Sequence, residues 1–452
     1  MINENKTFEK LRFWPLVWGL GLAGQLCWNM ENQWFNTFVY AKIAKDSTIV
    51  TMMVICSALV TAFSTFFFGT LSDRAGSRRK FISFGYIAWG VFTIVFGFTE
   101  FIGSGKIGAD AKMLLLAAFL VVLTDCVMSF FGSIGNDSGY NAWTNDMTTD
   151  ANRGQIGAAL ATQPVIGTIA GTVLGGLLIG SNDNYQRLFW VMGLFVITMG
   201  VISLLFLRDA PGLKPHREGS FWKQFSSVFN FRKFFGMREL ALACLTAVCY
   251  CISFNVFFVH IGNWLIYYMG FTPDKMGIIQ GVTLIAAMFL VIPAGALINR
   301  KKTPLVATCG IAITFAGLLL GGILIRPYNV DASAVFTVTN VPLIVLVFLT
   351  GAGFILFMQT MTIWIKQLYP ENSRGQFEGI RILSFILIPM LVGTTIGNIV
   401  IKNGSGSVIN EFGLAENIPT EAVFQWAAAL LLPVFVPLVY AEKLYNKRIK
   451  NN

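Results

Sequence analysis

Residues 69–80 form the stretch that decides the fold: Gly69-Thr-Leu-Ser-Asp73-Arg74-Ala-Gly76-Ser-Arg78-Arg79-Lys80. This short loop, rich in glycine and arginine, lies between two long apolar runs, 48–72 and 81–104. A degenerate copy follows the apolar run 274–299, as Gly295-Ala-Leu-Ile-Asn299-Arg300-Lys301-Lys302, at an offset of 226 residues. Because the loop recurs after about half of the chain, the sequence predicts an internal duplication.

A second repeated feature supports the duplication. Trp143 precedes Arg153-Gly154-Gln155 by ten residues, and Trp364 precedes Arg374-Gly375-Gln376 by the same ten, at an offset of 221. The longest polar connection, 208–238, lies between the two copies. We therefore divide the chain into an N-terminal half at 1–207, a cytoplasmic linker at 208–238 and a C-terminal half at 239–452.

Composition indicates that the whole chain is a membrane domain. Of its 452 residues 55% are hydrophobic and 12% charged, which is roughly half of the charged fraction of a soluble domain. A helix of about 20 apolar residues crosses the hydrocarbon core. Twelve runs meet this requirement: 13–40, 48–72, 81–104, 112–143, 155–180, 187–207, 239–269, 274–299, 303–326, 340–369, 374–402 and 421–445. We expect an all-α membrane protein with twelve transmembrane helices in two pseudo-symmetric six-helix halves.

Basic residues predict the orientation. With an even number of helices both termini lie on one side, and that side receives 25 of the 33 Lys and Arg residues. By the positive-inside rule this side is the cytoplasm, in a plasma or bacterial inner membrane. The net charge of +10 then reflects topology beside anionic lipid rather than nucleic-acid binding. The polar segment Met1–Arg12 lacks a small-residue cleavage site, so no removable signal peptide is expected.

The 69–80 loop resembles the signature of the major facilitator superfamily between its second and third helices. This resemblance implies a major facilitator fold over the entire chain. Within that superfamily, Asn136-Asp137, Asp150 and Arg153-Gly154 look like the pattern of the glycoside/pentoside/hexuronide symporters. Those symporters hold two aspartates, four residues apart, on their second helix. This chain has Thr61 and Thr65 there, so a sodium site of that design is not expected.

Side-chain amides form a stripe on the first expected helix. Gln25, Asn29, Asn32 and Asn36 fall within about 60° of one another at 100° per residue. Amides donate and accept hydrogen bonds together, which suits a solute that bears hydroxyl groups. The stripe is predicted to bind substrate, and the alternative is hydrogen bonding between helices.

Glu31 lies about 130° from the centre of that stripe by the same rotation. A carboxylate near the middle of a membrane costs about 2.5 to 3.5 kcal/mol unless it is protonated or paired. Glu31 is therefore either a proton site that couples transport or one member of a structural pair.

The expected helix at 112–143 also has a polar face. It carries Ser129, Ser133, Asn136, Asp137 and Tyr140, with Asp125 at its border. The resemblance places Asp137 where the sugar symporters hold an aspartate that grips hydroxyl groups. We assign Asn136, Asp137 and Tyr140 to substrate binding, and Asp125 and Asp137 to coupling.

The expected helix at 239–269 carries another polar stripe. His260, Asn263, Trp264 and Tyr267 follow the i, i+3, i+4, i+7 spacing of one helical face. His260, Asn263 and Trp264 are predicted to bind substrate. His260 could also relay a proton or make a neutral polar contact, and Trp264 could stack on a sugar ring or serve only in packing.

Charged and glycine residues of the loops are predicted to form a conformational gate, in which ion pairs form only when the inner side is closed. They are Gly69, Asp73, Arg74, Gly76, Arg78, Arg153, Arg374, Glu378 and Arg381.

These features predict a secondary active transporter for a small polar solute, most simply a saccharide or glycoside, moved by alternating access with proton coupling. A lipid-like or organic-anion solute on the same fold, or a non-transporting membrane sensor, stays an alternative. Nucleotide-binding and zinc-protease motifs are absent from the sequence, so no enzyme activity and no cofactor are expected. Seven scattered cysteines and two histidines predict no metal site. A monomer is expected.

Overall fold

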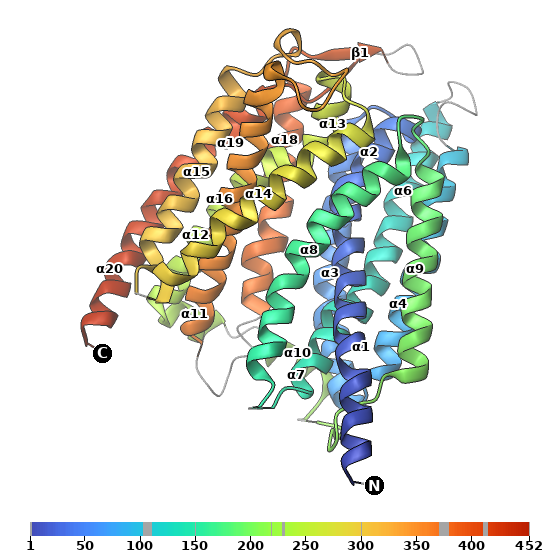
Figure 1. Ribbon diagram of the computed structural model, residues 1–452, viewed down its shortest axis with the longest axis vertical. Coiled ribbons are helices and arrows are strands. Elements are labelled where there is room, and N and C mark those ends of the chain that lie inside the picture. The colour runs from blue at the N-terminus through green and yellow to red at the C-terminus, as the bar shows by residue number, and fades with distance from the viewer. Residues whose placement is uncertain are drawn as a thin grey trace. The chain divides into compact units, whose positions relative to one another are not determined.

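The computed structural model shows a chain built almost wholly of long helices (Figure 1). It describes residues 2–102, 111–149, 151–217, 219–227, 231–299, 301–369, 379–409 and 415–451.

Ten stretches of the described chain are long and apolar enough to span a membrane. They are Ser47–Ala75, Arg79–Ile102, Lys112–Asp146, Arg153–Ile179, Tyr185–Phe206, Arg238–Tyr268, Thr303–Ile323, Val338–Gln367, Gly379–Lys402 and Ala422–Lys450. Each coincides with one of the predicted spans to within a few residues. The other two predicted spans are also helical. They correspond to helix 1, which starts at α1 (Ile2–Met30) and continues to Ile43, and to α14 (Pro273–Asn299). The predicted fold class is confirmed.

The chain forms two compact units. Unit 1 comprises Met1–Ala44 and Cys56–Ser226, and unit 2 comprises Lys45–Ile55 and Ser227–Asn452. The segment Lys45–Ile55 belongs to unit 2, although the chain before and after it belongs to unit 1. This segment includes the start of α3 (Ser47–Ala75), so α3 contributes to both units.

Unit 1 is built around two close helix pairs (Figure 1). Here α4 (Arg79–Phe98) packs along α9 (Tyr185–Phe206), and α1 packs along α8 (Arg153–Ile179). A further helix, α6 (Ala111–Gly132), continues through a π-helical segment into α7 (Asn141–Asp146) and packs against α4.

Unit 2 has its own set of helix pairs. In it α15 (Thr303–Ile323) packs along α16 (Val341–Gln367), and α14 also contacts α16. The other pair is α12 (Arg238–Phe258) with α18 (Ile388–Lys402). The remaining elements are α19 (Ala422–Leu431) and α20 (Phe435–Asn451).

Several membrane helices contain π-helical turns, which insert a residue into the α-helix and are frequent at functional sites. They are η1 (Glu31–Phe35), η2 (Val39–Ile43), η4 (Ser133–Tyr140), η5 (Trp264–Tyr268) and η9 (Leu383–Leu387), and the short helix α2 (Asn36–Phe38) separates the first two. The predicted site residues Glu31, Asn136, Asp137, Tyr140 and Trp264 lie inside these turns.

Two details depart from an all-helical chain with a plain linker. After α18 the antiparallel strands β1 (Ser407–Ile409) and β2 (Ala415–Asn417) form a small hairpin, which the sequence analysis did not predict. The linker contains two short helices, α10 (Phe221–Ser227) and α11 (Phe231–Gly236). The boundary between the units lies within this linker, after Ser226.

Candidate functional site

The amide stripe of helix 1 faces the backbone of α8. A Cβ atom at Gly167 would lie 2.4 Å from the Gln25 Cβ, and one at Gly171 would lie 2.5 Å from the Asn29 Oδ1. Because glycine has no side chain, α8 can approach this closely. The Thr172 hydroxyl then reaches helix 1 and donates to the Gln33 Oε1 at 2.9 Å. Part of the stripe is therefore used for packing between helices.

Two other amides of the stripe bond to their own helix. Asn32 donates to the backbone oxygen of Trp28, and Asn36 donates to that of Asn32, each at 2.7 Å. Asn36 is buried, whereas Gln25, Trp28 and Asn32 are half-buried.

Asn136 of η4 is the centre of a buried relay. It donates from Nδ2 to the Tyr86 hydroxyl oxygen at 2.8 Å, and the Tyr86 hydroxyl donates to the backbone oxygen of Leu20 at 2.7 Å. The Trp28 indole donates to the Asn136 Oδ1 at 3.4 Å. Asn136 therefore connects α6, α4 and helix 1, and it positions the Trp28 ring.

Tyr140 and Asp137, also in η4, have different surroundings. The buried Tyr140 hydroxyl donates to the backbone oxygen of Val17 at 2.7 Å. Asp137 is half-buried. Of the residues predicted on this helix to bind substrate, Asp137 is the most exposed.

Trp28 is a candidate that the sequence analysis missed. It lies three residues after Gln25 and four before Asn32, so it shares their helical face. Its ring contacts that of Trp89, with centroids 4.9 Å apart. The i, i+3, i+7 spacing of Gln25, Trp28 and Asn32 is present in the sequence. The tryptophan was missed because only the amide side chains were considered as one stripe.

Glu31 faces α6 rather than α8. Its Oε1 accepts a hydrogen bond of 2.8 Å from the Ser129 hydroxyl. Asp125 lies one turn before Ser129 on the same helix and is also buried. The structure thus separates Glu31 from the amide stripe and places it beside Asp125.

The predicted stripe of unit 2 is closed off from solvent. His260, Asn263 and Trp264 are each 0% exposed. Within the described chain, neither ring nitrogen of His260 nor the Trp264 indole nitrogen has a hydrogen-bond partner. The Trp264 ring meets Phe424 edge-to-face at 4.7 Å. Burying polar groups without partners is unfavourable, so His260 and Trp264 are packed while their ring nitrogens lack hydrogen bonds within the described chain.

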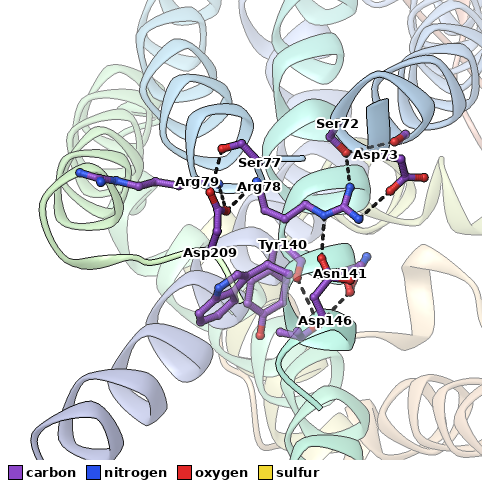
Figure 2. Close-up of polar contacts among 12 residues, drawn as sticks. Ser72, Asp73, Ser77, Arg78, Arg79, Tyr140, Asn141, Asp146 and Asp209 are labelled. Carbon is purple, nitrogen blue, oxygen red and sulfur yellow. Dashed lines mark hydrogen bonds and ion pairs between the residues drawn. The ribbon is translucent and has the colours of Figure 1, made fainter. Parts of the chain in front are cut away.

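The predicted gate residue Arg78 is the centre of a polar cluster in unit 1 (Figure 2). Its guanidinium lies 2.6 Å from an Asp73 oxygen and 2.8 Å from an Asp146 oxygen, and it also donates to the Ser72 hydroxyl at 2.5 Å. Arg78 is only 5% exposed. Burial opposes its charge, but the hydrogen bond to Asp146 and the charge of Asp73 outweigh burial, so its pKa is raised.

Asp209, which follows the C-terminal end of α9, binds the start of α4 (Figure 2). Its Oδ1 accepts from the backbone N–H groups of Arg78 and Arg79 at 2.6 and 2.8 Å, and its Oδ2 accepts from the Ser77 hydroxyl at 2.8 Å. These N–H groups have no partner inside the helix, and the negative charge favours this terminus.

The linker also contacts the 69–80 loop of unit 1. Gly76 has a φ of +65° and lies against Pro215, whose nitrogen would be 2.6 Å from an added Cβ. His216 donates its backbone N–H to the backbone oxygen of Asp73 at 2.9 Å. Arg74 donates to the backbone oxygen of Gly219 and to the Gln224 Oε1, each at 3.0 Å. Three predicted gate residues thus contact the linker.

The other predicted gate residues have different surroundings, although Gly69 touches this cluster through Ser72. The backbone oxygen of Gly69 accepts from the Ser72 hydroxyl at 3.0 Å. Arg153 is exposed at the start of α8, and Arg381 lies over the Phe385 ring at 6.0 Å. Arg374 and Glu378 lie outside the described residues.

The sequence analysis missed the acidic partners of these arginines. Asp146 and Asp209 bind the 69–80 loop of unit 1. In unit 2, Glu239 accepts from Arg448 twice at 2.9 Å and from the Trp364 indole at 2.8 Å. Asp146 comes three residues after the repeated Trp143, and this position was the available signal.

Comparison with known proteins identifies the family. The profile described as Major Facilitator Superfamily matches residues 22–338 and, in an overlapping match, 243–451. The mouse (Mus musculus) MFS-type transporter SLC18B1 is 27% identical over 184 residues, which is 40% of this chain and 37% of the mouse protein. The chain thus covers well under half of that relative.

Two solved structures share the fold. The nucleoside transporter NupG, solved as a point mutant, superposes with a TM-score of 0.67 at 12% identity, covering 95% of this chain and 99% of that one. A bacterial homologue of the iron transporter ferroportin, in an inward-facing state, gives 0.56 at 12% identity, covering 93% and 98%. The profile match over most of the sequence shows that the chain belongs to the Major Facilitator Superfamily, as a multi-pass membrane protein.

Proposed function

We propose that the protein is a secondary active transporter that moves a small polar solute bearing hydroxyl groups, of the saccharide or glycoside class, by alternating access with a proton. The observation that carries this proposal is that Gln25, Trp28, Asn32 and Asp137 are only half-buried, whereas the polar residues around them are buried. Buried relays hold the neighbouring Asn136 and Tyr140 in place.

The chemistry of this surface favours a hydroxylated ring. Amides of Gln25 and Asn32 can donate and accept, and the Asp137 carboxylate accepts charge-assisted hydrogen bonds from hydroxyl groups. The Trp28 indole offers an aromatic face for the apolar side of a sugar ring. Asn29, Asn36, Asn136 and Tyr140 then support this surface from behind. His260, Asn263 and Trp264 would contact solute only in a conformation that exposes them.

Solute identity is tested by thermal stabilisation of the purified protein. A ligand at about 100 times its dissociation constant adds about 2.7 kcal/mol to stability. The panel should hold sugars, glycosides, nucleosides, organic anions and amphiphiles, since the structurally similar NupG is a nucleoside transporter. Stabilisation by amphiphiles or organic anions alone would favour the alternative cargo. Binding without uptake into proteoliposomes would favour a sensor.

Asp137→Asn tests the role of the carboxylate. The variant keeps the shape and one acceptor oxygen but loses charge-assisted bonds worth about 1.5 to 3 kcal/mol each. Solute binding should weaken by roughly ten- to a hundredfold. Near-normal affinity and accumulation together with a lower melting temperature would remove Asp137 from the binding surface. Exchange without accumulation would assign it to coupling alone.

Coupling is tested in proteoliposomes. Because Thr61 and Thr65 stand where sodium-coupled relatives hold aspartates, uptake should follow a pH gradient and ignore sodium. A rise in affinity or rate with sodium, at constant pH and membrane potential, would contradict proton coupling.

The proposed orientation places both termini and the linker in the cytoplasm, where the Arg78 cluster and Arg153, Arg381, Arg374 and Glu378 would act as the inner gate. Single cysteines at Ser220 and Asn403 of a cysteine-free variant should react oppositely with an impermeant reagent added outside intact cells. Equal labelling of the two positions would contradict this topology.

A further inference from the structure

Two carboxyl groups lie together in the interior of unit 1. Glu31 begins the first π-helical turn of helix 1, and Asp125 lies on α6. They are 8% and 1% exposed. The charge of Asp125 acts on Glu31, and both residues belong to apolar membrane-spanning helices.

One oxygen of each carboxyl group has no hydrogen-bond partner within the described chain. The Ser129 hydroxyl donates to the Glu31 Oε1 at 2.8 Å, and the Ser57 hydroxyl bonds to Asp125. The Glu31 Oε2 and the Asp125 Oδ1 have no partner within the described chain, although both are buried. Each carboxyl group therefore has one oxygen satisfied by a serine and one that is not.

The titratable groups around the pair are acids, and none of them is a cation. The titratable groups acting on it are the thiols of Cys27 and Cys126 and the carboxyl of Asp137, with Cys56 beside Cys126. No Lys, Arg or His of the described residues forms an ion pair with either carboxyl group. Two ionised carboxylates at such a site would repel each other without any compensating cation.

A single bound proton reduces both the repulsion between the two carboxylates and the number of acceptor oxygens that lack a donor. Bound to one of the two orphaned oxygens, it forms an O–H bond, halves the negative charge of the pair and supplies a donor where there were only acceptors. Its release returns the proton to water and leaves two carboxylates. Buried carboxyl pairs share a proton in this way because like charges cannot both ionise in close proximity.

We propose that Glu31 and Asp125 form a proton-binding site, which holds one shared proton in the conformation described here and exchanges it with water during transport. The inference rests on the proton coupling proposed above and names its site. Asp137 is half-buried and lies in η4, which continues from the helix α6 that carries Asp125. Solute and proton therefore bind to separate carboxyl groups in this scheme.

The site can be tested without knowing the solute. Infrared difference spectra of the full-length protein in lipid nanodiscs, recorded between mildly acidic and mildly alkaline pH, report the carbonyl stretch of protonated carboxyl groups. The wild-type protein should show such a band near neutral pH. It should shift in each of the single variants Glu31→Gln and Asp125→Asn, because burial still favours the protonated form of the remaining carboxyl group. It should disappear in the double variant, which has neither carboxyl group.

Glu100→Gln is the matched control. Glu100 forms an ion pair of 3.4 Å with Lys42 and accepts from Gln186 at 2.8 Å, so both of its partners lie outside the Glu31–Asp125 site and its loss should leave the band unchanged. Ser129→Ala provides a second readout if a carboxyl variant does not fold. It should shift the frequency of the band, because the donor to Glu31 is removed.

The outcomes separate the site from the proposed function. No band in the wild-type protein, a band that survives unchanged in the double variant, or a band removed by sodium at neutral pH would each overturn the proton site. A band that behaves as expected, in a protein whose uptake ignores a pH gradient, keeps the site and rejects proton-coupled transport. Uptake that follows the gradient without such a band places coupling elsewhere.

Discussion

The loops after α3 and after α14 both contain a left-handed residue, supplied by glycine in one and by lysine in the other. Each helix is followed by a residue in the left-handed region, Gly76 with a φ of +65° and Lys301 with a φ of +61°. A residue with a Cβ atom loses about 1–2 kcal/mol in this conformation. Unit 2 accepts that strain at Lys301, so the turn by itself does not require the glycine of unit 1.

The difference lies in what packs on each loop. The backbone of Pro215 lies where a Cβ of residue 76 would be, and the linker continues through contacts with Asp73 and Arg74. Lys301 is exposed. The glycine of the signature loop is therefore needed for the close approach of the linker as well as for the turn.

The two units also place their buried charge differently. In unit 1 the loop arginine Arg78 is almost fully buried between two carboxylates. In unit 2 the corresponding ion pair joins the ends of α12 and α20, between Glu239 and the more exposed Arg448. If the packing around each loop determines its contribution to stability, substitutions in the buried cluster of unit 1 should lower the stability more than substitutions in unit 2.

The largest effect is expected from Arg78→Ala. It leaves Asp73 and Asp146 without their shared cation, and breaking a buried pair costs about 3–5 kcal/mol. Thermal unfolding of the detergent-purified protein, followed by intrinsic fluorescence, measures the loss. Arg448→Ala is the counterpart in unit 2 and should cost less, because the Arg448 side chain is 30% exposed. Equal losses would mean that burial does not distinguish the two clusters.

Gly76→Ala should follow, at about 2–4 kcal/mol. The left-handed conformation and the contact with Pro215 both oppose a Cβ atom. Hydrogen exchange by mass spectrometry should also rise in the linker around α10, because its docking to the loop is disturbed. Gly212→Ala is the control: φ is +88° but nothing lies within 4 Å of its Cβ position. Loss of linker protection in both variants would attribute the effect to strain alone.

Asp209→Ala should destabilise unit 1 by about 1–2 kcal/mol, the usual range for a lost helix N-cap. The N–H groups of Arg78 and Arg79 lose their acceptor. Asp209→Asn keeps an acceptor oxygen and should recover most of the melting temperature. If asparagine is as damaging as alanine, charge rather than hydrogen bonding holds the start of α4.

The smallest effect, and the only stabilising one, is expected from Lys301→Gly. Relief of the left-handed strain should raise stability by about 0.5–1 kcal/mol. The neighbouring Lys302→Gly is the control, since Lys302 has a φ of −104° and gains nothing from glycine. A lower melting temperature for Lys301→Gly would show that its side chain makes a contact worth more than the strain.

The membrane helices could be predicted because lipid imposes length and apolarity on each span. The repeated loops were visible for a similar reason, since their charges interrupt long apolar runs. The partners of Arg78 were not predictable. Asp146 and Asp209 lie 68 and 131 residues away in sequence, and no periodicity connects residues that tertiary packing brings together.

The polar faces were predictable only in part. The α-helical rotation placed Glu31 away from the amide stripe, as the structure has it, with Ser129 on one side and Thr172 on the other. It could not indicate that the glycines of α8 occupy the space in front of Asn29, because a stripe of small residues and a solute path leave similar patterns in one helix. The roles of these residues stay predictions.

The π-helical turns bear on how this chain is aligned with other sequences. Each of them accommodates an extra residue within a helix that keeps its direction. A relative whose first helix is α-helical throughout would match this chain only with a one-residue gap at Glu31–Phe35, in the middle of an apolar span where alignments normally forbid gaps. Without that gap, every residue beyond the turn would be compared with a neighbour about 100° around the helix. Coupling and solute residues would then be paired with lipid-facing ones, and family patterns read across this turn would lose their meaning.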